Sequence, residues 1–334
     1  MDIHILTPAP PGSKAGNRAT AERWQQLLEQ AGHRVRVHTE LSSRPCDCFI
    51  ALHAWRSHEA IEVFRQARPQ VPLITVLTGT DIYFHQHQYP DDTLRSMVLA
   101  DALVGLHHRV ADDIPEAFRG KLVTVLQSAD RIPAPEPGLT GSDPGTSVFE
   151  VCVIGHLRDE KDSLRAALAC HHLPAESRIR VTNAGKAHNQ EWRIKAELEQ
   201  AHNPRFQWIG ELNKADTQAL MARSRVMVIS SVMEGGANVV SEACRAGLPV
   251  LASDISGNRG LLGEDYPGYF RVGDERHLAE RLLRAETDAG YLASLQVKVS
   301  DKAAQFVPEA EQGALLLAIA QATANSKARL NPAG

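Results

Sequence analysis

The chain has 334 residues, of which 43% are hydrophobic and 23% charged, as is typical of globular proteins that fold in water. One hydrophobic core rarely supports this length, so we expect two domains. The formal net charge of −4 argues against a nucleic-acid-binding protein. No apolar run approaches the length of a membrane span, and the first residues lack a signal-peptide pattern. The five cysteines lack paired CxxC spacing, which predicts free thiols and a cytoplasmic protein.

Short apolar strands alternate with helical patterns in the first part of the chain. The expected strands are residues 1–7, 35–39, 48–52, 73–77, 102–105 and 122–126, and helical patterns cover 19–31 and 58–67. This alternation predicts an α/β domain over 1–131, with a parallel sheet covered on both faces. Residues 132–147 are rich in Pro and Gly and are predicted to form an interdomain linker.

A second alternating series predicts a second α/β domain over 148–305. Its expected strands are 148–154, 178–182, 206–209, 226–229, 250–252 and 268–270. A last helix is expected over 312–324, in the C-terminal segment 306–334. It could pack on either domain, including back on the N-terminal one. Both domains are expected to be doubly wound and Rossmann-like. Ligands of such sheets bind beyond the carboxyl ends of the strands, so the two domains are expected to share a cleft.

The first strand ends in a loop rich in Gly and Pro, TPAPPGSKAGNRAT (7–20), before a helix begins. Backbone N–H groups of such a loop commonly cradle an anion. The candidate anion-binding residues are Gly12, Ser13, Lys14 and Arg18, of which Lys14 and Arg18 add positive charge. The loop is not GxGxxG and no acidic residue for a dinucleotide ribose is evident, so NAD is not favoured. The alternative is an exposed loop with solvated cations.

Two further loops of the first domain place polar side chains after strands. LHAWRS carries His53 and Arg56, and LTGTDIY carries Thr78 and Asp81. Parallel strands end at the same edge of their sheet, so these residues are expected to lie at one edge. A single histidine after a strand is more often structural than catalytic, but clustered polar groups at strand ends favour function. The fifteen histidines show no H-E-x-x-H or Cys/His spacing, so we expect no zinc site.

The second domain opens with a strand that runs into a charged turn, VIGHLRDEKD (153–162). The turn contains Gly155, His156, Arg158 and Lys161. Arg and Lys side chains neutralise a leaving diphosphate without a metal. The chain has no D-x-D pair of the kind that chelates a metal–nucleotide complex, so we expect a metal-independent reaction. The alternative is a mixed-charge loop without a ligand.

The segment MEGGANVVSEACRAGLPV (233–250) carries two glutamates eight residues apart, Glu234 and Glu242. An apolar strand, 226–229, precedes it and a helical pattern covers 239–246. The turn that opens this helix consists of Gly235, Gly236, Ala237 and Asn238. Small residues and the helix dipole favour a diphosphate there. Glu242 is expected two helical turns beyond Glu234, so that both carboxylates accept hydrogen bonds from sugar hydroxyls. The alternative is a capped helix with solvated glutamates.

Taken together, these segments resemble GT-B glycosyltransferases of the family 4 type over nearly the whole chain. AGHRVRV (31–37) resembles the end of that family's first helix and its second strand, and the two glutamates match its E-x7-E motif. In GHLRDEK, Lys161 stands at the lysine of the family's G-R-x-x-x-x-K motif. His156 stands where the arginine is usual, with Arg158 two residues on, and Thr78 stands where many relatives have a histidine. Both departures suggest a nonstandard acceptor.

More narrowly, TPAPPGSKAGNR, GHLRDEKD, EGGANVVSEA and SGNRGLLGEDYPGYF resemble the selenosugar synthases of selenoneine biosynthesis. The resemblance implies transfer of an N-acetylhexosamine from a UDP-sugar, with UDP-GlcNAc expected, to selenophosphate, with loss of UDP and phosphate. It implies that Arg158, Lys161 and Glu234 are catalytic and that Gly155, His156, Gly235, Gly236, Ala237, Asn238 and Glu242 bind the donor. The implied acceptor-binding residues are Gly12, Ser13, Lys14, Arg18, His53, Arg56, Thr78 and Asp81. No cofactor, nucleic acid or membrane partner is implied.

Two other activities use the same kind of donor site. A conventional glycosyltransferase transfers the sugar to a hydroxyl or lipid acceptor, although the first domain shows no Lys/Arg-studded amphipathic helix for membrane contact. A UDP-GlcNAc 2-epimerase shares the architecture but needs carboxylates or histidines placed for proton transfer at C2, which the sequence does not clearly show. A sugar-nucleotide sensor without catalysis would not require the polar strand ends of the first domain.

Overall fold

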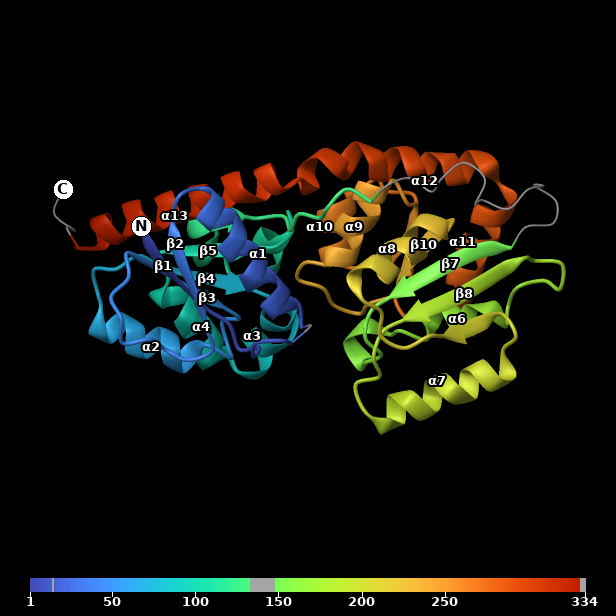
Figure 1. Ribbon diagram of the computed structural model, residues 1–334, viewed down its shortest axis with the longest axis horizontal. Helices are drawn as coiled ribbons and strands as arrows, with labels where there is room; N and C mark the ends of the chain where they lie inside the picture. The colour runs from blue at the N-terminus through green and yellow to red at the C-terminus, as the bar shows by residue number, and fades with distance from the viewer. Residues whose placement is uncertain (14, 133–147, 331–334) are drawn as a thin grey trace. The chain divides into compact units, whose positions relative to one another are not determined.

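The computed structural model describes residues 1–13, 15–132 and 148–330, which form two compact units (Figure 1). Unit 1 consists of Met1–Ser128 together with the chain from Val307 onward, and unit 2 is Ala129–Phe306. The sequence placed the domain boundaries at residues 131, 148 and 305. Of the expected linker, 133–147 lie outside the described residues. None of the described helices is long and apolar enough to cross a membrane.

Unit 1 is built on a six-stranded parallel sheet of order β2-β1-β3-β4-β5-β6. The strands are β1 (Asp2–Leu6), β2 (Arg34–His38), β3 (Cys48–Leu52), β4 (Leu73–Leu77), β5 (Ala102–Gly105) and β6 (Leu122–Thr124). Every residue of β3 and β4 is buried, because both faces of the sheet are covered. The predicted strands of this half are therefore all present, with ends shifted by a few residues.

Helices cover this sheet on both faces. They are α1 (Gly16–Gln30), α2 (His58–Ala67), α3 (Gln86–Gln88), α4 (Pro90–Leu99), α5 (Val110–Asp113) and α13 (Pro308–Leu330). Two short turns, the π-helical η1 (Asp81–His85) and η2 (Glu116–Lys121), complete the unit. The sequence placed the last helix at 312–324; the observed α13 is longer at both ends, starting at Pro308, a residue well suited to the first turn of a helix.

The last helix belongs to the core of unit 1. Helix α13, drawn in red in Figure 1, packs against α1, β4, β5 and β6. Its residues Leu315 and Ile319 share one buried cluster with Trp24 of α1. Glu311 is only 1% exposed, and its carboxylate accepts hydrogen bonds from the indole Nε1 of Trp24 at 2.7 Å and from the backbone N–H of Ser128 at 2.7 Å. These bonds fix the start of α13 to the end of the first stretch of unit 1.

Unit 2 contains a second parallel sheet, of order β12-β11-β10-β7-β8-β9. Its strands are β7 (Phe149–Ile154), β8 (Ile179–Ala184), β9 (Phe206–Trp208), β10 (Val226–Ile229), β11 (Val250–Ser253) and β12 (Tyr269–Phe270). The helices are α6 (Arg165–Cys170), α7 (Gln190–His202), α8 (Lys214–Arg223), α9 (Asn238–Ala246), α10 (Ser256–Leu262), α11 (Glu275–Thr287) and α12 (Ala289–Lys302). The turns η3 (Asp159–Lys161) and η4 (Ala303–Phe306) complete it. The doubly wound architecture expected for each half is confirmed.

Each sheet reverses its strand order at one place. In unit 1 the chain passes from β1 outward to β2 and then returns to β3 on the other side of β1. In unit 2 it passes from β7 to β8 and β9 and returns to β10 on the other side of β7. Loops on the two sides of such a switch point diverge and leave a crevice beyond the carboxyl ends of the strands, where doubly wound proteins bind ligands. The loops after β1 and β3 in unit 1, and after β7 and β10 in unit 2, are therefore the candidate ligand-binding loops.

The cysteines agree with the expectation from their spacing. All five are free and buried. Burial raises the pKa of Cys152, on β7, to about 12, so this thiol stays protonated and inert near neutral pH.

Candidate functional site

The loop after β7 is held close to the loop after β8. A Cβ on Gly185 would lie 1.9 Å from the carbonyl oxygen of Gly155, so this approach requires glycine at 185. The backbone N–H of Lys186 donates to Nδ1 of His156 at 3.1 Å. Burial is the main cause that lowers the pKa of His156. His156 thus joins two loops and is favoured in its neutral form.

Lys161 and Glu234 meet across the switch point of unit 2. Lys161 ends η3, in the loop after β7, while Glu234 lies in the loop after β10. The ammonium group donates to Oε1 of Glu234, and the hydroxyl of Ser231 donates to the same oxygen at 2.6 Å. The side chain of Lys161 is 21% exposed and that of Glu234 only 8%. The structure therefore joins two predicted catalytic residues in one partly buried ion pair.

A close backbone contact fixes the position of Glu234. A Cβ on Gly257, in α10, would lie 2.1 Å from the carbonyl oxygen of Glu234. Any side chain at 257 would push this loop away from its place beside Lys161. Ser230 adds a second tie, since its hydroxyl donates to the carbonyl oxygen of Asp162 at 2.8 Å. The roles of Gly257, Ser230 and Ser231 were not predicted from the sequence.

The helix that follows Glu234 starts without a side-chain cap. Four other helices of unit 2 begin with a capping carboxylate or amide, from Asn189, Asn213, Asp274 and Asp288. Ala237 is the N-cap residue of α9 and makes no side-chain cap bond, as is also true of the N-cap residues of α6 and α10, and no acidic residue lies in the first turn of α9. The dipole at this end favours an anion. The predicted donor-binding residues Gly235, Gly236, Ala237 and Asn238 all lie at this helix start.

The expected spacing of the two glutamates was wrong in one respect. Helix α9 begins at Asn238, so Glu234 precedes it and only one helical turn separates Asn238 from Glu242. The two glycines that follow Glu234 lie before the helix, with a bend at Gly235. Glu242 is half-buried on α9 and has interactions of its own. Its contact with a ribose stays a prediction.

Arg158 is the more exposed of the two predicted cations. Its side chain is 44% exposed and Nε lies 3.7 Å from Oε2 of Glu160. This separation is that of a loose surface ion pair rather than a fixed hydrogen bond. Arg158 is thus available at the rim of the loop, whereas Lys161 is held within it.

In unit 1, the loop after β1 has the turn expected from its glycine. Gly12 has φ +77°, a conformation that favours glycine, and Ser13 follows with its backbone N–H donating to the carbonyl oxygen of Pro10 at 3.1 Å. Arg18 lies in α1, where Nε donates to Oε1 of Glu22 at 2.6 Å. The positive charge of Arg18 is therefore balanced within the helix. Lys14 lies outside the described residues.

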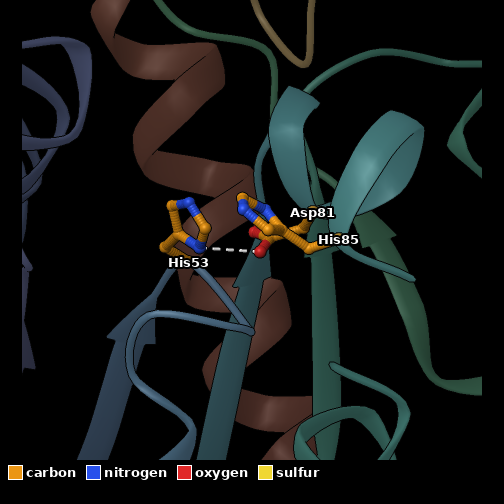
Figure 2. Close-up of side chains that lie close together, drawn as sticks. All are labelled: His53, Asp81 and His85. Atoms are coloured by element: carbon orange, nitrogen blue, oxygen red, sulfur yellow. Dashed lines mark ion pairs between the residues drawn. The ribbon is translucent and has the colours of Figure 1, made fainter. Parts of the chain in front are cut away.

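Asp81 organises the loops after β3 and β4 (Figure 2). It is fully buried, and its carboxylate accepts the backbone N–H groups of Ala54, Trp55 and Thr78 at 2.9–3.0 Å. His53 Nδ1 lies 2.7 Å from the same carboxylate. Burial by itself would raise the pKa of Asp81, but its hydrogen bonds, first that with His53 and then those from the backbone of Thr78 and Trp55, lower it below its usual value. Two of the predicted residues, His53 and Thr78, thus contact the ionised carboxylate of the third, Asp81.

An aromatic stack, not predicted from the sequence, lies against this cluster. His85 stacks on Trp55 with ring centroids 4.2 Å apart, and Trp55 stacks on Tyr89 at 4.9 Å. The only sequence signal was the density of His and Tyr between residues 83 and 89. His53, Asp81 and His85 each offer one potential metal-ligand atom, all within 4.8 Å of one another (Figure 2). Arg56, the remaining predicted residue, is exposed beside them.

The geometry agrees with what comparisons with known proteins show. A solved structure of Anabaena Alr3699/HepE in complex with UDP has a TM-score of 0.75 at 16% identity, covering 96% of this chain and all of that chain. The sucrose-phosphate synthase of Thermosynechococcus elongatus has a TM-score of 0.76 at 14% identity, covering 97% and 99%. HepE has also been solved with UDP-glucose. The chain therefore has the GT-B architecture of two Rossmann-like domains.

The sequence comparisons concern mainly unit 2. Residues 144–306 match the family Glycosyl transferases group 1, a stretch that covers the described part of the second domain. A glycogen synthase of Mycobacterium tuberculosis is 26% identical over 244 residues, which cover 68% of this chain and 57% of that protein. The chain thus spans little more than half the length of this relative.

Proposed function

We propose that this chain is a glycosyltransferase that transfers N-acetylhexosamine from a UDP-sugar, UDP-GlcNAc expected, to selenophosphate. The products are a selenosugar, UDP and phosphate. The observation that carries the glycosyl transfer is the partly buried pair of Lys161 and Glu234, close in the chain to the start of α9. Both lie at the switch point of the domain that matches the glycosyltransferase family. The acceptor and the hexose rest on the sequence resemblance.

The proposed donor site uses charge already present in unit 2. The diphosphate binds at the start of α9 with Lys161 and Arg158, and Glu242 accepts hydrogen bonds from ribose hydroxyls. Glu234 contacts the hexose. Lys161 and Glu234 already orient each other before the donor binds. The polar groups of the UDP-sugar then bind between these two side chains. Cations fixed before the reaction stabilise the charge that develops on departing UDP. We therefore propose a reaction that needs no metal.

The proposed acceptor site lies in unit 1. Gly12 and Ser13 lie in the loop after β1, Arg18 lies in the helix that follows, and Arg56 adds an exposed cation beside His53. Lys14 is added to this proposed site from its place in the sequence alone. A small anionic acceptor is served by such groups, whereas a sugar hydroxyl does not require them. Selenium is itself a strong nucleophile, so positioning contributes more than deprotonation to the attack on the anomeric carbon.

A hydroxyl acceptor is the second candidate, and one observation favours it. His53 is oriented by Asp81 at 2.7 Å, an arrangement that suits a general base for an alcohol. The two candidates differ in what triggers UDP release. With a hydroxyl acceptor, selenophosphate should not accelerate it.

The test is product analysis by mass spectrometry after incubation of the full chain with UDP-GlcNAc, first alone and then with selenophosphate. We expect UDP release that requires selenophosphate, together with a selenium-containing sugar. An isomerised UDP-sugar formed without any acceptor would identify an epimerase. Selenophosphate-independent transfer to an added alcohol would identify the conventional activity.

A further inference from the structure

The loops after β3 and β4 hold a hydroxyl, an imidazole and a carboxylate in a row. Oδ1 of Asp81 lies 2.7 Å from Nδ1 of His53, and Nε2 of His53 lies 3.1 Å from the hydroxyl oxygen of Thr80. His53 is 2% exposed and Asp81 is fully buried, whereas Thr80 is half-exposed. The row therefore runs from the interior of unit 1 to its surface.

The buried end of the row influences which ring nitrogen of His53 carries the proton. The lowered pKa of Asp81 keeps the carboxylate ionised, so it only accepts hydrogen bonds. Nδ1 of His53 accepts the backbone N–H of Arg56 at 3.2 Å, but the carboxylate of Asp81 at the shorter distance of 2.7 Å favours a proton on this nitrogen. In the neutral imidazole the lone pair is therefore on Nε2, which faces Thr80. A hydroxyl beside an imidazole that is oriented by a carboxylate is the arrangement that activates hydroxyl groups in catalysis.

The backbone is shaped to present this row. His53 has φ +73°, a left-handed conformation that is uncommon for a residue with a Cβ. Asp81 opens η1, a π-helical turn, and such turns are frequent at functional sites. Thr80 directly precedes this turn, so Asp81 and Thr80 both approach His53 from the loop after β4. The hydrogen bonds that Asp81 accepts from the loops after β3 and β4 hold this strained backbone in place.

The side chains around the row favour an anionic substrate over a metal ion. Arg56 is exposed three residues after His53. The oxygens of Asp81 already accept the N–H groups of Ala54, Trp55 and Thr78, which leaves little capacity for a metal. His85 lies with its ring centroid 5.2 Å from that of His53, and burial lowers its pKa. A base next to an exposed cation suits proton transfer on a phosphorylated substrate.

We propose that Thr80, His53 and Asp81 form a proton relay that hydrolyses the selenium–phosphorus bond of the glycosylated selenophosphate. This step rests on the proposed function, in which phosphate is lost after sugar transfer. Water attacks phosphorus and forms the new O–P bond as its proton passes to the hydroxyl of Thr80, whose own proton passes to Nε2 of His53. The Se–P bond breaks and its electron pair stays on selenium. The products are phosphate and a selenolate, which later takes the proton from the imidazolium.

The experiment separates sugar transfer from phosphate loss. The full chain is incubated with UDP-GlcNAc and selenophosphate, UDP is measured, and iodoacetamide traps the free selenol before mass spectrometry. Thr80→Val removes the hydroxyl at a half-exposed position and keeps the side-chain shape. We expect unchanged UDP release, phosphate loss slowed about 100-fold or more, and accumulation of the phosphorylated selenosugar. Thr80→Ser should restore phosphate loss, and His85→Gln should behave as the wild type.

Three results would overturn the relay. Phosphate loss at the wild-type rate in Thr80→Val would show that its hydroxyl takes no part, while the proposed function would stand. Loss of both steps in parallel would place Thr80 in substrate binding or folding. Loss of the second step in His85→Gln, or with EDTA, but not in Thr80→Val would instead identify a metal site of His53, Asp81 and His85. A wild-type chain that releases no UDP with selenophosphate would refute the proposed acceptor, and this step with it.

Discussion

The two switch points hold their charged groups in different ways. In unit 2, Lys161 and Glu234 pair with each other, and the Lys161 side chain remains 21% exposed. In unit 1, Asp81 is fully buried, and its hydrogen bonds go to backbone N–H groups and to its neighbours His53 and Thr78. A ligand can therefore replace a partner in the Lys161–Glu234 pair, whereas the carboxylate of Asp81 is out of reach of a ligand. The difference indicates that unit 2 offers charge to a ligand, whereas unit 1 offers an oriented imidazole.

The largest expected effect is on the cations of unit 2. Lys161→Ala should lower turnover by about 10²–10³-fold, because departing UDP would lose a preorganised cation worth roughly 3–4 kcal/mol by analogy with an oxyanion donor. Arg158→Ala should act in the same direction with a smaller loss, since this side chain is exposed. Steady-state UDP release measures both.

A matched control for Lys161 lies on α7, where Lys195 and Glu191 form an exposed pair at 2.6 Å. Lys195→Ala should leave turnover unchanged. EDTA should also have no effect on the wild type. Complete loss of activity in EDTA, recovered with magnesium, would reject charge stabilisation by these cations alone.

The second effect concerns the stability of unit 1 in acid. His107 is fully buried, and burial lowers its pKa to about 4 from its usual 6.5. Between these pH values the unfolded chain binds a proton that the folded chain does not, so stability falls as pH falls from 6.5 to 4. The difference corresponds to about 3 kcal/mol. Urea unfolding across this range should show the loss in the wild type and a shallower one in His107→Gln.

Exposed His202 of α7 provides the comparison for this measurement. His202→Gln should keep the wild-type dependence on pH. An equally steep loss of stability in His107→Gln would assign the acid sensitivity to other groups.

The third effect separates fold from function at Glu242. Glu242→Gln keeps the size of the side chain, so the fold should survive while UDP affinity falls. A hydrogen bond to a charged partner is worth roughly 1.5–3 kcal/mol, which sets the expected loss in calorimetry. Glu280→Gln, at an exposed position of α11, is the control. Unchanged UDP binding by Glu242→Gln would leave this residue a solvated helix position.

The smallest effect is expected on the acceptor side. Arg18→Ala and Lys14→Ala should raise the KM for selenophosphate more than that for the UDP-sugar, because both precede or begin the first helix of unit 1. Arg18 is already paired with Glu22, so we expect a change of only several-fold. The effect should weaken with salt, since exposed charges are screened within roughly 10 Å at 0.1 M. Arg284→Ala removes an exposed i,i+4 pair with Asp288, the residue after α11, and is the control.

Wild-type selenophosphate kinetics in both Arg18→Ala and Lys14→Ala would show that the loop after β1 is structural. The glycosyl transfer proposed for unit 2 would be unaffected by that result. Only its acceptor would have to be sought elsewhere.

Much of the candidate site could be predicted because it depends on residues close together in sequence. Gly235 and Gly236 follow a buried strand and precede a helix, so their place at a helix start follows from local pattern. The contact of Lys161 with Glu234 spans 73 residues and depends on β7 and β10 being neighbours. The loops with His53 and Thr80 were expected at one edge of the sheet, but the contacts of Thr80 and His85 with His53 depend on how the loop after β4 folds.

The sequence by itself determined the strands, the two-domain α/β organisation and the loops that carry polar groups, because these follow from hydrophobic periodicity and turn residues. Only the tertiary structure decided where α13 packs, since its apolar face matches many partners and the bonds of Glu311 to Trp24 and Ser128 select one. It also decided which groups contact His53. Its Nδ1 lies against a buried carboxylate 28 residues further along the chain, and only the packing of the loops after β3 and β4 brings the two together.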